Sequence, residues 1–185
     1  NHSSAASDVY KRQPEILDNH FNYIYYPVID VAAHVYGTNS DEWQNEVNIF
    51  SEFLSRMIKI DSNRYTCITA DHGVVNIEDQ NKFRLEYDES VKIYGDQRAV
   101  YINGEVEKIE KVFKNVPGYF LEKEEIISLL GTPTNEHIEN FYPEQIFLLD
   151  DGNIIFPNHL SANLKGYHGG ISKTEVSIPL IEIIN

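Results

Sequence analysis

The sequence predicts an α/β fold, with a mixed and mostly parallel sheet flanked by helices. Strand-like apolar segments at residues 21–30 and 65–70 enclose an amphipathic helix pattern, which is the order of a βαβ unit. Clusters of Asp and His then stand near the ends of these predicted strands. Open α/β sheets bind their ligands at the carboxyl ends of strands, so this arrangement indicates both a fold class and a site.

The predicted βαβ unit begins with FNYIYYPVID at residues 21–30, an aromatic and β-branched segment. Asn39 or Ser40 can cap the following helix, whose first turn is acidic. Its apolar side chains repeat at helical spacing: Val47, Phe50, Phe53, Leu54, Met57 and Ile58. The second strand, YTCITA at residues 65–70, is nearly all apolar, as in a strand covered on both faces, so Cys67 is predicted to be buried.

The remainder of the chain is predicted to mix strands and helices. In order we expect a loop with a short strand (76–97), a strand (98–104), a helix (105–116), a short strand and a helix (117–131) and a hairpin (144–156). Gly131 is expected to end the second of these helices, and Asp151–Gly152 to form the hairpin turn. The segment SKTE fits a capping box, with Ser172 at the N-cap and Glu175 at the third helical position.

The composition restricts the function classes. The 185 residues are 42% hydrophobic and carry a formal net charge of −14, which suits one domain or part of a larger one. Such an acidic chain repels nucleic acid and anionic membranes, so we expect neither as a partner. No apolar run approaches the roughly 20 residues of a membrane helix, and the single Cys excludes an internal disulfide.

The first residues do not resemble the start of a domain. Residues 1–13, NHSSAASDVYKRQ, begin without Met and lack the apolar core of a signal peptide. They resemble a translated sequencing-adaptor leader, so we assign them as non-native and begin the domain at residue 14. We expect residues 14–185 to be the C-terminal part of a longer domain.

Three places along the chain carry clustered Asp and His residues. Asp30 and His34 are four residues apart, so both project from one face if the chain turns helical after Asp30. Asp71 and His72 follow the second predicted strand. His168 lies among glycines, which allow unusual torsions and a close backbone approach.

These five side chains offer only nitrogen and oxygen donors. Such a set suits Zn²⁺ or Mn²⁺ in a hydrolytic site rather than a structural thiolate zinc. Neighbouring parallel strands lie about 4.8 Å apart. Ligands at two strand ends could therefore hold two ions at the roughly 4 Å separation that phosphoryl chemistry favours.

Each cluster also has a simpler interpretation. Asp71, His72 and the following Gly fit a turn, and Asp30 fits an acidic helix start with His34 as a chance neighbour. His168 alone indicates little. The metal-site hypothesis rests on the whole set.

Three segments resemble the C-terminal metal motifs of the alkaline phosphatase superfamily, most closely its type I phosphodiesterase / nucleotide pyrophosphatase family. They are YYPVIDVAAHVYG, ITADHGVV and GYHGGISKTEVSIPLI, in the family's order and roughly in its spacing. GDQRAVYI at residues 95–102 also resembles a stretch of prokaryotic members. The resemblance runs from about residue 14 to 185 and implies an alkaline-phosphatase-like fold whose N-terminal part is missing here.

By that resemblance, Asp30, His34 and His168 would hold one zinc ion, and Asp71 and His72 would help to hold a second. The family completes the second site with an earlier Asp and a Thr or Ser nucleophile, both from an N-terminal segment. No residue of this chain matches that nucleophile motif, so we assign no catalytic residue and expect the fragment to be inactive alone.

The resemblance implies a metal-dependent hydrolase of phosphodiester, pyrophosphate or phosphomonoester bonds. Its cofactors would be two divalent ions, Zn²⁺ first and Mn²⁺ second, and its substrate a small phosphorylated molecule such as a nucleotide. The reaction would pass through a covalent phospho-Thr or phospho-Ser intermediate. The alternatives are another superfamily activity, such as a sulfatase or phosphomutase, a non-catalytic metal-binding α/β protein, or an α/β domain without metal.

Overall fold

The computed structural model describes residues 20–59, 65–157 and 163–184. The predicted leader at 1–13 lies outside these residues. The helices are α2 (Val28–Tyr36), α3 (Asp41–Lys59), α4 (Val106–Phe113), α5 (Lys123–Leu130), α6 (Glu136–Glu139) and α7 (Lys173–Val176), with a short 3-10 helix η1 (Asp79–Asn81). The strands are β1 (Tyr65–Thr69), β2 (Val75–Asn76), β3 (Lys82–Leu85), β4 (Val91–Gly95), β5 (Ala99–Gly104), β6 (Gly118–Phe120), β7 (Gln145–Leu149), β8 (Ile154–Pro157), β9 (Gly166–Tyr167) and β10 (Leu180–Ile184).

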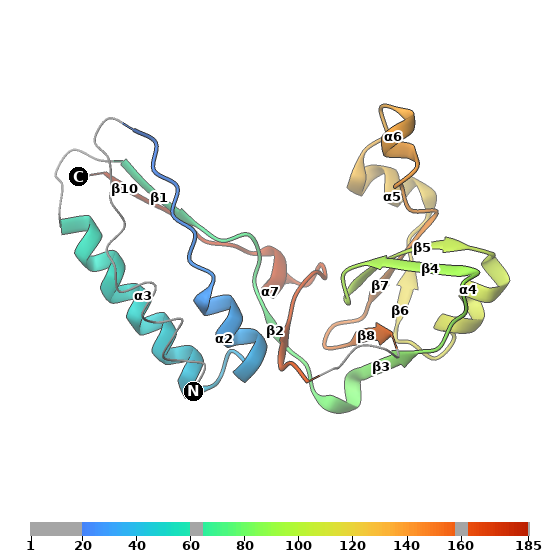
Figure 1. Cartoon of the computed structure of the whole chain (residues 1–185), viewed down its shortest axis with the longest axis horizontal. Coiled ribbons are helices and arrows are strands. Elements are labelled where there is room, and N and C mark those ends of the chain that lie inside the picture. Colours follow the sequence, from blue (N-terminus) through green and yellow to red (C-terminus); the bar gives the residue numbers. More distant parts are fainter. Residues whose placement is uncertain (1–19, 60–64, 158–162, 185) are drawn as a thin grey trace.

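Two groups of elements are joined by a narrow middle (Figure 1). One end holds α2, α3 and the pair β1–β10, and the other holds the four-stranded sheet with α4, α5 and α6. The β2–β9 pair and α7 lie between them. None of the helices in the described ranges is both long and apolar enough to cross a bilayer.

The expected α/β class is confirmed, but its strand directions need correction. The four-stranded sheet has the order β4-β5-β7-β6 with antiparallel neighbours. The β1–β10 and β2–β9 pairs are antiparallel as well, and β3–β8 is parallel. Among the described strands the pairing is thus mainly antiparallel rather than mostly parallel.

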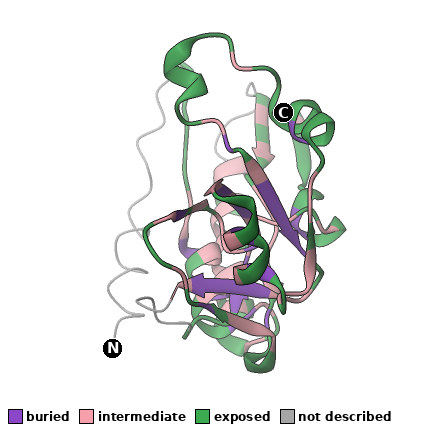
Figure 2. Ribbon diagram, turned by 90° about the vertical axis from the view of Figure 1, so that its right-hand side faces the viewer, coloured by how far each residue is buried: buried purple, intermediate pink, exposed green. Residues whose placement is uncertain are grey.

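The main core lies against the four-stranded sheet. On β5, Val100 and Ile102 are buried at every second position, as one face of a sheet requires. Helix α4 turns Ile109 and Phe113 toward them, and Phe113 packs on Phe147 of β7 with ring centroids 4.7 Å apart. Figure 2 shows the buried residues gathered along the strands and exposed residues on the outlying helices.

Two predicted boundaries are confirmed with their predicted causes. The backbone N–H of Trp43 donates to the Ser40 hydroxyl at 3.1 Å, so Ser40 caps α3 as expected. Helix α5 ends at Gly131, whose φ of 78° only glycine adopts easily and whose N–H donates to the carbonyl of Ile127.

The predicted strand at residues 21–30 is wrong. Residues 21–27 carry neither helix nor strand, and α2 begins at Val28. Pro27 explains the difference, because it has no N–H for a strand ladder and its carbonyl accepts the first helical bond, from Val31 at 3.0 Å. The expected βαβ unit is therefore absent from this part of the chain.

The strand at 65–70 forms as β1, but its environment differs from the prediction. Within the described residues β1 pairs with β10 on one side, and its residues are exposed or half-exposed. Cys67 is exposed rather than buried. An apolar run alone does not show whether other elements cover a strand.

The predicted hairpin at 144–156 is also wrong, although the turn at Asp151–Gly152 is present. Strand β7 pairs with β5 and β6, whereas β8 pairs in parallel with β3. The chain passes from one sheet to another at this turn, so β7 and β8 form their backbone hydrogen bonds in different sheets.

A buried ion pair joins the sheet to α7. Arg98 Nε lies 2.6 Å from Glu175 Oε1 and Nη2 lies 2.8 Å from Oε2, and both side chains are 1% exposed. Ser172 is the N-cap residue of α7, as predicted, but its hydroxyl donates to the Glu175 carboxylate at 2.5 Å instead of capping the backbone. Burial raises the pKa of Glu175, yet hydrogen bonds from Arg98, Ser172 and Gly170 outweigh it and hold this pKa below its ordinary value.

This pair predicts an acid-labile contribution to stability. Because the folded-state pKa of Glu175 lies below the ordinary 4.5, its contribution is fully present above that pH and is lost as the pH falls through the folded-state value. Glu175→Gln should lower the free energy of unfolding by about 3 kcal/mol near pH 7 and lose less on acidification than the unsubstituted chain. Urea unfolding at several pH values measures both effects, and equal acid sensitivity of the two proteins would contradict the assignment.

Candidate metal centre

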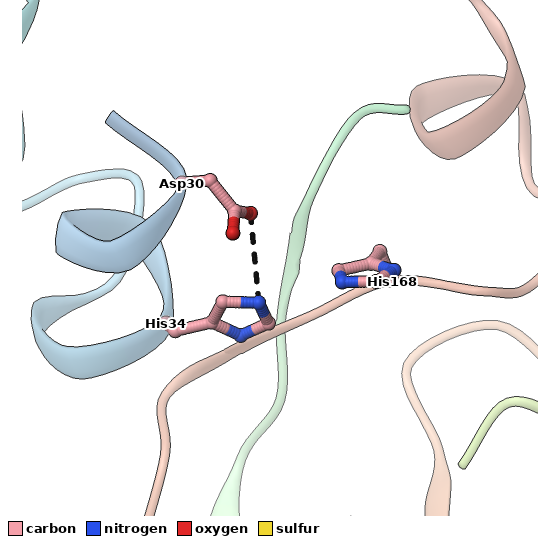
Figure 3. A group of neighbouring side chains, drawn as sticks. All are labelled: Asp30, His34 and His168. Atoms are coloured by element: carbon pink, nitrogen blue, oxygen red, sulfur yellow. Dashed lines mark ion pairs between the residues drawn. The ribbon is translucent and has the colours of Figure 1, made fainter. Parts of the chain in front are cut away.

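Helix α2 places Asp30 and His34 on one side. Val28, Ala32 and Ala33 are buried and anchor the opposite face of the helix. The four-residue spacing then brings His34 Nε2 to 3.5 Å from Asp30 Oδ1, with side-chain exposures of 22% and 36%. Figure 3 shows both side chains turned toward the segment that carries His168.

One carboxylate oxygen of Asp30 is buried without a hydrogen-bond partner among the described residues. Asp30 Oδ1 is inaccessible to solvent and has no hydrogen-bond partner within the described residues; its neighbour is the His34 imidazole at 3.5 Å. A buried charged oxygen is costly unless a cation or donors satisfy it. This oxygen is therefore suited to a metal ion.

The ring orientation of His34 is fixed from behind. His34 Nδ1 lies 2.7 Å from the carbonyl oxygen of Gly166, and since a carbonyl can only accept, Nδ1 carries the proton of this bond. In the neutral imidazole, Nε2 then keeps its lone pair on the Asp30 side, which is the state that a metal ligand needs. The backbone supports the same contact, because the N–H of Lys165 donates to the carbonyl of His34 at 2.7 Å.

Gly166 permits this approach of β9 to α2. A Cβ at residue 166 would lie 2.4 Å from the carbonyl oxygen of Ala33. We expect Gly166→Ala to push the strand from the helix and to lower the free energy of unfolding by about 1–3 kcal/mol. The midpoint temperature of thermal unfolding and the metal affinity should both fall. A variant in which neither value changes would contradict this packing.

His168 reaches the pair on α2 from the end of β9. One ligand atom from each of Asp30, His34 and His168 lies within 4.8 Å of the others, as expected for a group that can hold one ion. Burial lowers the pKa of His168, the charges of His72 and His34 lower it further, and Asp96 and Asp30 oppose the change. The neutral imidazole, which binds metals, is thereby favoured.

Asp71 and His72 adjoin this group without joining it. The His72 ring stacks on that of His168, with centroids 3.6 Å apart and planes 18° apart. His72 Nδ1 contacts the carbonyl of Gly73 at 3.1 Å, and Nε2 lies 3.7 Å from Asp71 Oδ2. The Asp71 side chain is 72% exposed. These two donors thus lie beside the triad and remain accessible.

Asp96 lies beside the site, although the sequence patterns did not indicate it as a site residue. Its Oδ2 lies 3.8 Å from His168 Nδ1. A Cβ on Gly169 would lie 2.2 Å from the Asp96 carboxyl carbon, so a glycine is needed beside the His. Asp96 lies in GDQRAVYI, which resembles a stretch of prokaryotic members of the phosphodiesterase / nucleotide pyrophosphatase family. That resemblance was the one sequence signal that could have pointed to Asp96.

Comparison with known protein families identifies the chain as an alkaline-phosphatase-like domain. The family described as "BREX system PglZ alkaline phosphatase-like domain" matches residues 8–183. The chain belongs to this family and, through it, to the alkaline phosphatase superfamily. No curated protein matches the sequence significantly.

Solved structures share the fold at low sequence identity. Murine ectonucleotide pyrophosphatase / phosphodiesterase 5 superposes with a TM-score of 0.69 at 17% identity, over 98% of this chain and 52% of its own. Phosphonoacetate hydrolase from Sinorhizobium meliloti 1021 gives a TM-score of 0.59 at 14% identity, over 83% of this chain and 43% of its own. The chain thus spans about half the length of the solved structures that it resembles.

Proposed function

We propose that this chain carries a divalent-metal site of a hydrolase that acts on phosphoester bonds. The observation that carries the proposal is the convergence of the Asp30 oxygen, which lacks a hydrogen-bond partner in the described residues, with two imidazoles, His34 and His168. Family membership supports a hydrolase, and the geometry supports the place of the metal. A bound divalent ion would stabilise the charge that develops on the transferred phosphoryl group.

The residues would supply oxygen and nitrogen ligands to the metal ions. Asp30 supplies negative charge, and His34 supplies a neutral nitrogen whose orientation the Gly166 carbonyl fixes. His168 supplies the second nitrogen. Asp71 and His72 would contribute to a second ion beside the first, because they are adjacent and accessible. Zn²⁺ suits these donors best, with Mn²⁺ as the second choice.

The ligands of two solved structures support a substrate class for this chain. One structure of the murine enzyme, in an inactive form, holds AMP, and one of the bacterial hydrolase holds phosphonoacetate. We propose a small phosphorylated substrate, such as a nucleotide or another phosphodiester. With a formal charge of −14, the chain itself repels phosphate, so bound cations would be needed to attract it.

We further propose that residues 14–185 are the C-terminal part of the catalytic domain. The solved structures are about twice as long as their match to this chain. A Thr or Ser nucleophile and one more Asp ligand would come from the preceding part. The present chain should therefore bind metal but show no turnover.

The test is hydrolysis by a protein extended upstream with its natural sequence. We would assay p-nitrophenyl thymidine 5′-phosphate, p-nitrophenyl phosphate and p-nitrocatechol sulfate, with metal removed and then restored. Turnover of a phosphoester that returns with Zn²⁺ is the expected result. Turnover of the sulfate ester alone would favour a sulfatase, and zinc binding without any turnover would favour a non-catalytic metal protein.

A further inference from the structure

Glu175 connects two of the ligand-bearing loops through both its side chain and its backbone. Its Oε1 accepts the N–H of Gly170 at 2.8 Å, two residues after His168. Its carbonyl accepts the N–H of Gly73 at 2.8 Å, the residue after His72. The loops that carry the two stacked imidazoles are thus fastened to one residue.

Both loops approach Glu175 or the residue before it closely enough to require glycine. A Cβ on Gly73 would lie 2.0 Å from the carbonyl oxygen of Thr174. A Cβ on Gly170 would lie 2.8 Å from both Arg98 Nε and Glu175 Oε2. The glycines therefore allow direct backbone hydrogen bonding that any larger residue would displace.

Arg98 connects Glu175 to the rigid sheet. It immediately precedes β5, its carbonyl accepts the N–H of Leu149 of β7 at 3.1 Å, and its Nη1 donates to the carbonyl of Asn153 at 2.7 Å. The side chain also lies 3.6 Å from the Asp151 carboxylate. The contacts of the guanidinium with Asn153 and Asp151 leave it little rotational freedom, so it fixes the Glu175 carboxylate.

We propose that the Arg98–Glu175 pair is a positioning device that holds His168 and His72 in the geometry for metal binding. The pair touches none of the triad residues in the described contacts, so its role is indirect. The inference rests on the proposed metal site. It is favoured because a buried ion pair adds little net stability over apolar packing but imposes a specific geometry in some proteins. Metal ligands also need a supporting shell of fixed partners.

The experiment separates geometry from stability with matched variants. Arg98→Met combined with Glu175→Leu replaces the pair by apolar groups, which often leaves stability unchanged, but removes the acceptor for Gly170 and Ser172. Arg98→Lys keeps the charge and loses the planar fork. Lys108→Met is the control, because Lys108 pairs with Glu105 on the surface.

Co²⁺ titration with visible absorption measures affinity and ligand geometry together. The double variant should bind Co²⁺ about 10–100-fold more weakly than the unsubstituted chain and with an altered spectrum. Arg98→Lys should show a smaller loss, and Lys108→Met should show none. A folded double variant with unchanged affinity and spectrum overturns the proposal; if it does not fold, unchanged binding by Arg98→Lys overturns it instead.

A second readout keeps this inference separate from the proposed function. If the unsubstituted chain binds no Co²⁺, the metal proposal fails, and the inference is decided by NMR of the metal-free protein. Cross-peaks between the stacked rings of His72 and His168 should be present in the unsubstituted chain and lost in the Arg98 variants. Their retention in the variants overturns the positioning role.

Discussion

In the longer protein proposed above, His168→Ala should reduce kcat/KM for a phosphodiester by at least about a thousandfold. The substitution removes one of three ligand atoms that lie within 4.8 Å of one another. It also removes the ring on which His72 stacks, so the His72 imidazole loses this contact. Steady-state hydrolysis at saturating Zn²⁺ measures the effect.

The control for this substitution is His137→Ala. His137 lies on α6 beside Phe141, and the helix contributes no donor to the triad. Its replacement should leave hydrolysis unchanged while altering the same residue type. Activity of the His168 variant within a few-fold of the unsubstituted protein would show that the triad does not take part in the reaction.

Asp30→Asn should affect the metal-free and metal-bound proteins very differently. Without metal, relief of a buried carboxylate and loss of an acidic group in the first turn of α2 oppose each other, so the free energy of unfolding should change by less than about 1 kcal/mol. With Zn²⁺ at about a thousand times its dissociation constant, the unsubstituted chain gains about 4 kcal/mol. The variant should lose most of that gain, because the charged ligand is gone.

Thermal unfolding with and without Zn²⁺ measures this difference directly. Asp71→Asn is the matched control, since Asp71 is 72% exposed and lies outside the triad. It should keep most of the zinc-dependent stabilisation at the first site. An equal loss in both variants would mean that the negative charge of the chain holds zinc, rather than the triad. Unchanged stabilisation of the Asp30 variant by zinc would contradict the role of Asp30.

The sequence predicted the shared helix face of Asp30 and His34 better than the element that precedes it. Asp30 and His34 share a face because four-residue spacing is a local property of a helix, and this holds even though the predicted strand before Asp30 does not form. The aromatic and β-branched composition of 21–30 favoured a strand, but Pro27 starts a helix instead. The missing N–H of Pro27 thus decided between strand and helix, which the composition of 21–30 did not.

Long-range partners explain what the sequence could not predict. Arg98 and Glu175 are separated by 77 positions, and either residue read alone fits an ordinary surface charge. Likewise, β7 and β8 are close in sequence but pair in different sheets. Such pairing depends on which surfaces meet in the folded chain, and no local pattern of apolar residues specifies that.

The most direct test of the metal site is equilibrium dialysis of this chain against Zn²⁺, followed by metal analysis. We expect at least one tightly bound ion per chain, removable by EDTA. His34→Ala should lose this ion, while His137→Ala should retain it. A folded, unsubstituted chain that takes up no stoichiometric Zn²⁺, Mn²⁺ or Co²⁺ would contradict the proposed metal site.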